Sequence, residues 1–308
     1  MVTVSNAFMA ALADPDAHPQ RMVFKFDNGT IISNEDIDVE GGVDFHEVFC
    51  SETDLTIGLT PSSEISFGLF NIDGHWTNFT FGTFNAYIGV MLSETANGSA
   101  AVQRPSISIS NRTMTVSGNG KRQTLELCPL GRFIAPRPAV VQKVLIDVTA
   151  NDQMTLFDEN LPSAATLGIT YPVTAGNMLR ALCSHVGVSA SSYSFLNSTL
   201  TMDEPETETY TMRDVLGWIA EAACANARFN REGVLELAWF NTTSKSFNEG
   251  NYATFEPSWY QAPQVQKLHI RNADSTEEAI VGSGTSAYMI QNNPFLRQDD
   301  TEEEEEST

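Results

Sequence analysis

The feature that most constrains this chain is a series of short β-rich segments over its first 150 residues, separated by glycine, asparagine and proline. This spacing of strands and turns is typical of a β-barrel or β-sandwich. Several segments alternate apolar and polar side chains, as half-buried strands do. The expected strands are residues 22–26, 30–33, 43–49, 65–70, 86–92, 106–110, 113–117, 123–127 and 140–149.

Local turn chemistry refines this prediction. Residues 22–26 and 30–33 flank Asn28 and Gly29, and an Asn-Gly pair supplies the positive φ angle that tight hairpin turns require. Residues 128–138 contain three prolines and are expected to break regular structure. We therefore predict a domain over residues 1–160 that is a β-barrel or β-sandwich; the family resemblance described below implies the barrel.

The middle of the chain has the pattern of two amphipathic helices. Residues 174–187 begin with Thr174 as a candidate N-cap and end at Gly187, and the second helix follows Thr211, where Asp214 completes a capping-box pattern. Thr211 follows Thr174 by 37 residues, and a hairpin is expected after each helix, at residues 193–202 and 227–240. These features predict an α+β domain over residues 161–250, built of two related helix–hairpin (αββ) units. The alternative is that these are two ordinary amphipathic helices, and that their similar patterns 37 residues apart arose by chance.

The C-terminal part returns to β character. Residues 265–271 alternate, residues 282–284 read as a turn, and residues 251–296 are expected to form a β segment. Residues 297–308 are a block of like charges, for which we predict disorder. The predicted fold class is mixed α+β and mainly β.

Charge and composition exclude several classes of protein. The 308 residues carry 39 acidic and 17 basic side chains and a formal net charge of −22. Proteins that bind nucleic acid concentrate Lys and Arg against phosphates, so this charge argues against a nucleic-acid-binding protein.

No apolar stretch approaches the ~20 residues of a membrane helix, so no membrane insertion is expected. The first residues lack the positive charge and apolar core of a secretory signal. The four cysteines include no CxxC pair, and Cys183 and Cys224 are both expected on apolar helix faces.

Residues that could carry chemistry do not form a recognisable constellation. The five histidines, at positions 18, 46, 75, 185 and 269, have no partner at metal-ligand spacing. Acidic pairs such as Glu35/Asp36 are expected by chance in so acidic a chain. Trp218 and Trp239 are expected to pack in the core or at an interface. We therefore predict no catalytic residues, no cofactor-binding residues, no metal ligands and no cofactor, and we do not expect an enzyme.

Three stretches together resemble the tail-hub (baseplate hub) proteins of tailed bacteriophages. The first, residues 26–33 with Asp36-Ile37 and residues 54–58, resembles the opening strands of the family's N-terminal barrel. The second is residues 211–240, and the third runs from Tyr288 to Asn293-Pro294-Phe295-Leu296, similar to a strand ending in these hubs. The matching positions of the second stretch are Arg213, Asp214, Leu216, Ile219, Ala220, Gly233, Leu235, Glu236 and Leu237.

The resemblance implies a structural role in a virion, and it implies that residues 251–296 are a β segment of a second, incomplete barrel. Hubs of this family form trimers at the distal end of the tail, between a distal tail or tail-tube protein above and a tip, spike or fibre protein below. It implies assembly in the host cytoplasm, with DNA passing through and not bound specifically. We also expect that part of the acidic surface lines the DNA conduit, since acidic walls repel phosphates; the alternative is that the acidity serves solubility. Two other functions remain open: a host-surface or carbohydrate-binding module, for which Trp76 is a candidate platform, and a cell-wall hydrolase.

Overall fold

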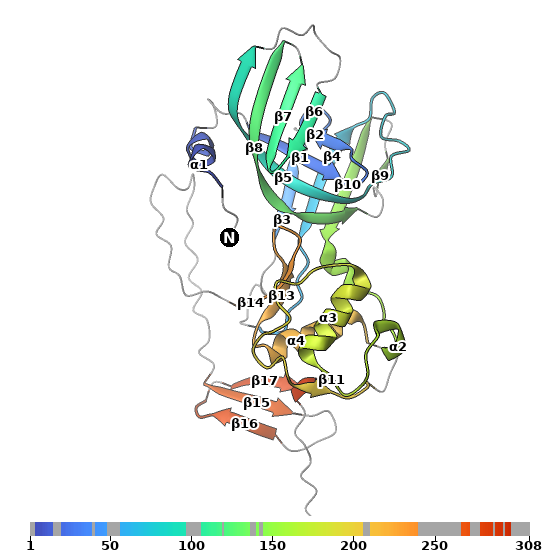
Figure 1. Cartoon of the computed structure of the whole chain (residues 1–308), viewed down its shortest axis with the longest axis vertical. Helices are drawn as coiled ribbons and strands as arrows, with labels where there is room; N and C mark the ends of the chain where they lie inside the picture. Colours follow the sequence, from blue (N-terminus) through green and yellow to red (C-terminus); the bar gives the residue numbers. More distant parts are fainter. Residues whose placement is uncertain are drawn as a thin grey trace, which may run out of the picture. The chain divides into compact units, whose positions relative to one another are not determined.

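The computed structural model confirms a mixed α+β chain that is mainly β (Figure 1). It describes residues 4–14, 20–38, 41–47, 56–96, 106–118, 120–135, 140–141, 144–205, 210–239, 266–271, 278–285, 287–291 and 293–296. The chain divides into two compact units. The first comprises Met1–Glu47, Ser62–Thr155 and Phe229–Val234, and the second comprises Val48–Pro61, Leu156–Arg228 and Leu235–Thr308.

The first unit is built on one large antiparallel sheet. Its strands follow the order β2-β1-β5-β8-β10-β4-β3, with β6 and β7 joined to β8 and β9 joined to β10. The strands are β1 (Gln20–Phe26), β2 (Ile31–Ser33), β3 (Val43–His46), β4 (Glu64–Phe70), β5 (Gly82–Ala96), β6 (Ser106–Ser110), β7 (Thr113–Gly118), β8 (Lys121–Ala135), β9 (Val140–Val141) and β10 (Leu145–Asp152).

The expected first hairpin is confirmed. Strands β1 and β2 pair with Lys25 opposite Ile31. The turn between them closes with a hydrogen bond from the Gly29 N–H to the Phe26 carbonyl, and the φ angle of Gly29 is +89°. Glycine is needed there because an L side chain rarely adopts that angle.

The path of paired strands is open, so the described sheet is not closed into a barrel. After β2 the chain leaves β1 and approaches β4 instead: Ile37 forms an isolated antiparallel bridge with Leu69, and the Asp38 N–H donates to the Gly68 carbonyl. Strand β2 is three residues long, too short to join the two edges of the sheet along their length.

Strand β8 differs from the prediction that residues 128–138 break regular structure. It runs through Ala135 and pairs with β5 along its length; residues 136–138 lie outside the described residues. Tyr87 lies opposite Pro129 and Ala86 opposite Gly131, so Leu130 is the extra residue of a β-bulge. A bulge is one of the few places where a sheet accepts a proline, which has no N–H to donate.

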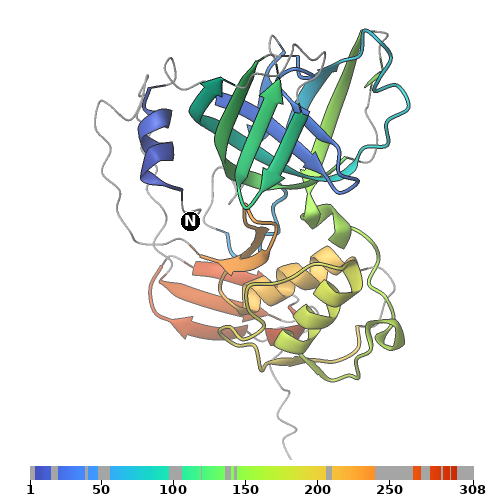
Figure 2. The same ribbon diagram turned by 45° about the horizontal axis from the view of Figure 1, so that its top comes forward.

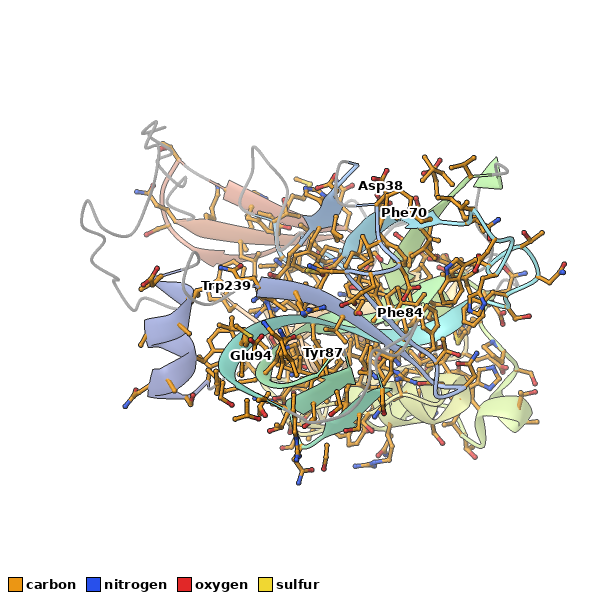
Figure 3. The ribbon with its side chains drawn as sticks, turned by 90° about the horizontal axis from the view of Figure 1, so that it is seen from above. Asp38, Phe70, Phe84, Tyr87, Glu94 and Trp239 are labelled. Atoms are coloured by element: carbon orange, nitrogen blue, oxygen red, sulfur yellow. The ribbon has the colours of Figure 1, made fainter. Side chains whose placement is uncertain are left out.

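Two apolar clusters hold the first unit together. The larger contains stacked and edge-on aromatic rings, with the ring centroids of Phe24 and Phe67 4.2 Å apart and those of Phe24 and Phe84 5.5 Å apart. Phe84, labelled in Figure 3, is fully buried. The smaller cluster lies around Met114, Leu125 and Leu127. Rings of this size bury enough apolar surface to dominate the stability of the unit.

A short N-terminal helix, α1 (Asn6–Leu12), was not expected from the sequence. Ser5 caps it, because its hydroxyl accepts from the Phe8 N–H. Phe8 and Ala11 are buried in a cluster with Val90 of β5.

The second unit contains the two expected helices, α3 (Ala175–Val186) and α4 (Met212–Ala222), which lie side by side (Figure 2). The predicted caps are confirmed: the Thr174 hydroxyl accepts from the Asn177 N–H, and Thr211 and Asp214 form a reciprocal capping box. The remaining elements before the C-terminal sheet are the 3₁₀-helix η1 (Gln153–Phe157), α2 (Ala164–Leu167), β11 (Val173–Thr174), β12 (Thr201–Met202), β13 (Asn226–Phe229) and β14 (Leu235–Ala238).

The two helices are not followed by equivalent hairpins. After α4 the expected hairpin forms as β13 and β14. After α3 the expected hairpin at residues 193–202 is wrong, since only Thr201–Met202 is a strand and it pairs with β11. The carbonyls of Ser198 and Leu200 instead accept from the Gly176 and Ala175 N–H groups. Capping α3 in this way uses carbonyl groups that a hairpin partner would have needed.

The C-terminal part of the second unit is a three-stranded sheet in the order β16-β15-β17. Strands β15 (Lys267–Arg271) and β16 (Glu278–Gly282) are antiparallel, and β17 (Ala287–Gln291) is parallel to β15. The 3₁₀-helix η3 (Pro294–Leu296) follows. The predicted disordered tail, residues 297–308, lies outside the described residues, and the predicted domain boundaries stay predictions.

Candidate functional site

Parts of all three stretches that carry the sequence resemblance meet in the second unit, around helix α4, whereas residues 26–33 and 36–37 of the first stretch lie in the first unit. We call this arrangement the motif junction and define it as residues 56–59, α4, Asn226, Tyr288 and Asn293–Leu296. Asp54 and Leu55 of the first stretch lie outside the described residues. Thr56, Ile57 and Gly58 belong to the second unit, whereas the sequence placed them with the opening strands of the N-terminal domain.

Residues 57–59 pair with the chain that follows α4. The Gly58 N–H donates to the Ala225 carbonyl at 2.8 Å, and the Ala227 N–H donates to the Leu59 carbonyl at 2.9 Å. The Leu59 N–H also donates to Oδ1 of Asn226, a fully buried side chain. Residues 57–59 therefore act as a strand partner of β13.

Two glycines allow this segment to approach α4 closely. The φ angle of Gly58 is +80°, and a Cβ atom there would lie 2.9 Å from the Glu221 Cβ and 3.2 Å from the Gly217 carbonyl oxygen. A Cβ on Gly217 would lie 3.1 Å from the Gly58 carbonyl oxygen. Any larger residue at either position would push the segment away from the helix.

The third stretch is tied to the same helix by Asn293, a side chain only 3% exposed. Its amide nitrogen donates to the Trp218 carbonyl at 2.9 Å and to Oε2 of Glu221 at 2.8 Å, while its Oδ1 accepts from the Phe295 N–H. Phe295 is buried. Asn293 thus forms hydrogen bonds with two groups on α4 and with the backbone of η3 at the same time.

Burial sets the protonation behaviour of two groups in the junction. Burial raises the pKa of Glu221 above its ordinary value of 4.5, although the hydrogen bond from Asn293 opposes the shift. Burial also raises the pKa of Tyr288, whose hydroxyl lies 3.3 Å from the Ile57 backbone nitrogen. Both groups are held by hydrogen bonds, Glu221 to the Asn293 amide and Tyr288 to the Ile57 backbone.

A second feature lies on the first unit, where three exposed apolar side chains stand together at one end of the β4–β10 pair. We call Phe70, Ile72 and Val144 the apolar edge patch. They are 38%, 78% and 51% exposed, and the backbone joins them, because Leu145 lies opposite Phe70 and the Asn71 N–H donates to the Val144 carbonyl. Adjacent exposed apolar groups mark protein–protein contact sites more often than scattered ones do. Phe70 is labelled in Figure 3.

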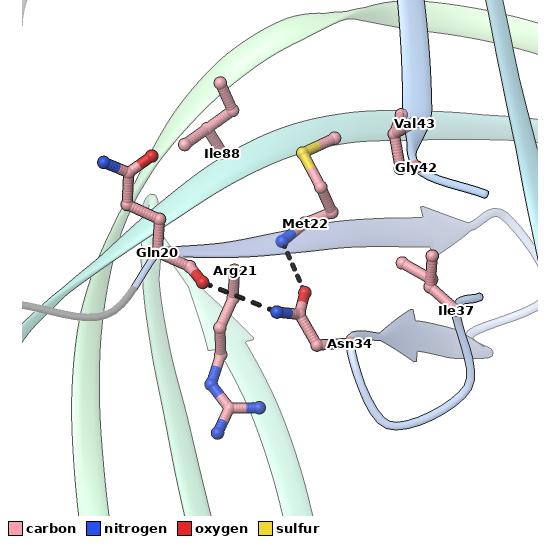
Figure 4. Close-up of a pocket in the computed structure, with 8 residues that line it drawn as sticks. All are labelled: Gln20, Arg21, Met22, Asn34, Ile37, Gly42, Val43 and Ile88. Carbon is pink, nitrogen blue, oxygen red and sulfur yellow. Dashed lines mark hydrogen bonds between the residues drawn. The ribbon is translucent and has the colours of Figure 1, made fainter. Parts of the chain in front are cut away.

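A pocket of about 280 Å³ lies where the open sheet fails to close, lined by Met22, Ile37, Val43 and Ile88 among others (Figure 4). The side chain of Asn34 hydrogen-bonds to the backbone of β1 there. Its Oδ1 accepts from the Met22 N–H at 2.8 Å, and its amide nitrogen donates to the Gln20 carbonyl. The side chain of Asn34 thus takes the place of a strand that β2 is too short to provide.

The residues considered for chemistry lie apart from one another. Trp76 is 3% exposed and packs in the core, so it cannot serve as a sugar-binding platform. Trp218 is half-buried and packs edge-on against Tyr210, whereas Trp239 is 43% exposed and not a core residue. Burial raises the pKa of Glu35, but hydrogen bonds from Ser33 and Arg21 outweigh burial and the net shift is downward.

Histidines, cysteines and carboxylates do not form a metal site within the described residues. His46, His75, His185 and His269 lie on separate elements, and His18, Cys50 and Trp259 lie outside the described residues. Cys183 is buried on α3 as expected. The prediction for Cys224 is wrong: it is exposed, beyond the end of α4, with a φ angle of +53°. Among the described helices, none has the length and apolar character to cross a bilayer.

These observations define a mainly β protein whose recognisable motifs form packing contacts. No protein-family model matches the chain, and no curated protein matches it in sequence. Among solved structures, it is similar to the 43 kDa tail protein of prophage MuSo2 from Shewanella oneidensis, with a TM-score of 0.43 and 12% identity over 88% of this chain and 72% of that one. It is also similar to a tail protein from Neisseria meningitidis MC58, with a TM-score of 0.43 and 9% identity over 89% of this chain and 71% of that one. Both neighbours are tail proteins, but similarities this weak assign neither a family nor a function.

Proposed function

We propose that this chain is a structural component of a phage tail, and more specifically of the tail tip or baseplate hub. The observation that carries the proposal is the motif junction. Residues 56–58, α4 and Asn293–Leu296 come from the three stretches that resemble hub proteins and lie more than 100 residues apart at their widest in the sequence, yet they pack together through specific hydrogen bonds and close glycine contacts.

In this proposal the chain forms a homotrimeric ring. The ring joins a distal tail or tail-tube protein to a tip, spike or fibre protein, and DNA passes without specific binding. The net charge of −22 per chain supports a lumen that repels phosphates. The chain is then a virion component assembled in the host cytoplasm, and it performs no reaction of its own.

The apolar edge patch is the surface that we assign to contact between copies. Ile72 is 78% exposed, and burying it removes apolar area from water at about 25 cal/mol per Å². An obligate ring of this kind buries about 2,000 Å² or more per interface, so the patch supplies the apolar centre of a larger contact. Because each copy is strongly acidic, association should strengthen as salt screens the repulsion.

Sedimentation of the purified full chain tests the proposal. We expect a mass three times the 33.7 kDa of one chain at micromolar concentration in 0.15 M salt, with a larger trimeric fraction at 0.5 M salt. Ile72→Glu should shift the population to monomer. Leu196→Glu is the matched control, because Leu196 is 63% exposed but belongs to the second unit and has no role in the assigned contact.

A monomeric wild-type chain at micromolar concentration would count against the ring. If Leu196→Glu dissociates the trimer as strongly as Ile72→Glu, the assigned contact surface is wrong even though a ring forms. Release of sugars or peptides from purified peptidoglycan would overturn the structural role in favour of a hydrolase.

A further inference from the structure

The second unit contains a groove of about 470 Å³ along helix α3, which the proposed function does not use. Its lining comes from the segment after α2 and from the outer face of α3. The lining residues are Leu167, Gly168, Ile169, Thr170, Pro172, Val173, Thr174, Asn177, Arg180, Ala181 and Ser184.

Arg180 is the charged group of this lining, and two contacts hold it in place. One terminal nitrogen of its guanidinium donates to Oδ1 of Asn177 at 3.0 Å, and its central carbon lies 4.9 Å from the centroid of the Tyr193 ring. A guanidinium has five N–H donors, so most of those of Arg180 have no partner among the described residues. Stacking and the hydrogen bond reduce the entropy lost when the group binds an anion.

Arg180 differs from most arginines of the described residues, although Arg122 of β8 likewise has no carboxylate partner among them. Six other arginines of the described residues are paired with carboxylates: Arg21 with Glu35, Arg112 with Glu232, Arg132 with Asp27, Arg213 with Asp158, Arg228 with Glu236 and Arg231 with Glu47. No carboxylate of the described residues pairs with Arg180, although acidic side chains outnumber basic ones by more than two to one.

The other lining residues indicate what kind of anionic molecule fits beside Arg180. Leu167, Ile169, Pro172, Val173 and Ala181 are apolar, the last two of them buried, and Thr170, Thr174, Asn177 and Ser184 are polar. A sugar site usually offers an exposed aromatic face, but no aromatic side chain is in this lining, and Arg180 covers the ring of Tyr193. A polyphosphate carries several negative charges, whereas Arg180 is the one cation of this lining.

The length of the groove fits an extended polypeptide. Asn177 and Ser184 are seven residues apart on α3, which corresponds to roughly 10 Å of helix. This is the span of about three residues of extended chain. A carboxylate side chain flanked by apolar residues matches both the cation and its surroundings.

We propose that this groove binds a segment of a partner polypeptide in which one aspartate or glutamate is flanked by apolar residues, and that Arg180 contacts its carboxylate. At 0.15 M salt the acidic groups farther than about 8 Å from the groove are largely screened, so the fixed guanidinium dominates locally. The inference stands independently of the role in a phage tail.

Selection from a display library of random 12-residue peptides on the intact chain tests the inference. We expect enriched peptides to carry a single acidic residue between apolar residues. A selected peptide labelled for fluorescence anisotropy should bind about fivefold more weakly to Arg180→Gln, and its Glu→Gln or Asp→Asn version should bind wild type equally weakly. Arg122→Gln is the matched control, since Arg122 is exposed on β8 of the first unit and the same charge is lost.

A second variant leaves Arg180 in place. Ser184→Glu puts a carboxylate four residues after Arg180 on α3, where the two can pair within the helix, and it should also weaken the peptide several-fold. Circular dichroism should show α3 and α4 intact in both variants. Enrichment of no peptide, enrichment of peptides without an acidic residue, or equal loss with Arg122→Gln would overturn the proposal. Binding of an acidic polysaccharide that requires Arg180, without peptide binding, would assign the groove to a glycan instead.

Discussion

Replacing Gly58 by alanine should loosen the motif junction. Two effects add. The φ angle of +80° costs a non-glycine residue about 1–2 kcal/mol, and a Cβ atom 2.9 Å from the Glu221 Cβ and 3.2 Å from the Gly217 carbonyl oxygen adds about 1–3 kcal/mol of overpacking. The total is about 3 kcal/mol.

Gly187→Ala separates these two effects. Gly187 is in the same unit, its φ angle is +76°, and a Cβ there would meet no atom within 4 Å. This variant has the backbone strain without the steric clash, so it should cost only about 1–2 kcal/mol. The difference of about 2 kcal/mol between the variants is the contribution of the close approach.

Hydrogen exchange measured by mass spectrometry on peptides from α4 reports this difference locally. A loss of about 2 kcal/mol corresponds to roughly 30-fold faster exchange, so α4 amides should exchange about that much faster in Gly58→Ala than in Gly187→Ala. Equal rates in the two variants would refute the reasoning, because they would mean that the contact between residue 58 and α4 contributes nothing.

Three further predictions concern the second unit. Burial raises the pKa of Glu221, so the folded protein binds a proton at this carboxyl more tightly than the unfolded chain does. The protonated carboxyl therefore stabilises the folded state fully below about pH 4.5, and this stabilisation is lost as the pH rises through the pKa of Glu221 in the folded protein. Glu221→Gln should therefore raise the calorimetric unfolding temperature at pH 7.5 more than at pH 4.5, and an equal change at both pH values would contradict this. Burial also raises the pKa of Cys183 to about 12, so iodoacetamide followed by peptide mapping should label the exposed Cys224 first, and equal labelling rates would be inconsistent with the burial. Thr211→Ala removes the capping box of α4 and should cost about 1 kcal/mol in thermal unfolding, whereas Thr211→Ser should cost little; similar losses in both would argue against the cap.

Local signals in the sequence predicted local structure well. Thr174 and Thr211 cap α3 and α4, and Gly29 closes the β1–β2 turn. Each of these depends on groups within about four residues, so the sequence contains all of the relevant chemistry.

The predictions that failed depend on residues far away in the chain. Pro129 was expected to end a strand, but pairing with β5 absorbs it in a bulge opposite Tyr87. Residues 193–202 were expected to form a hairpin, but their carbonyls cap the N-terminus of α3. In both cases a distant backbone supplied a partner that outweighed the local preference.

The sequence alone therefore determined the mainly β class, the two capped helices and the stretches that resemble hub proteins, because these follow from propensity, spacing and turn chemistry. The tertiary structure alone decided that Trp76 is buried, that Ile72 is exposed, that Asn293 binds α4 and that Arg180 faces a groove without a carboxylate. Burial and pairing are properties of neighbours in space, and those neighbours lie tens to hundreds of residues apart in this chain.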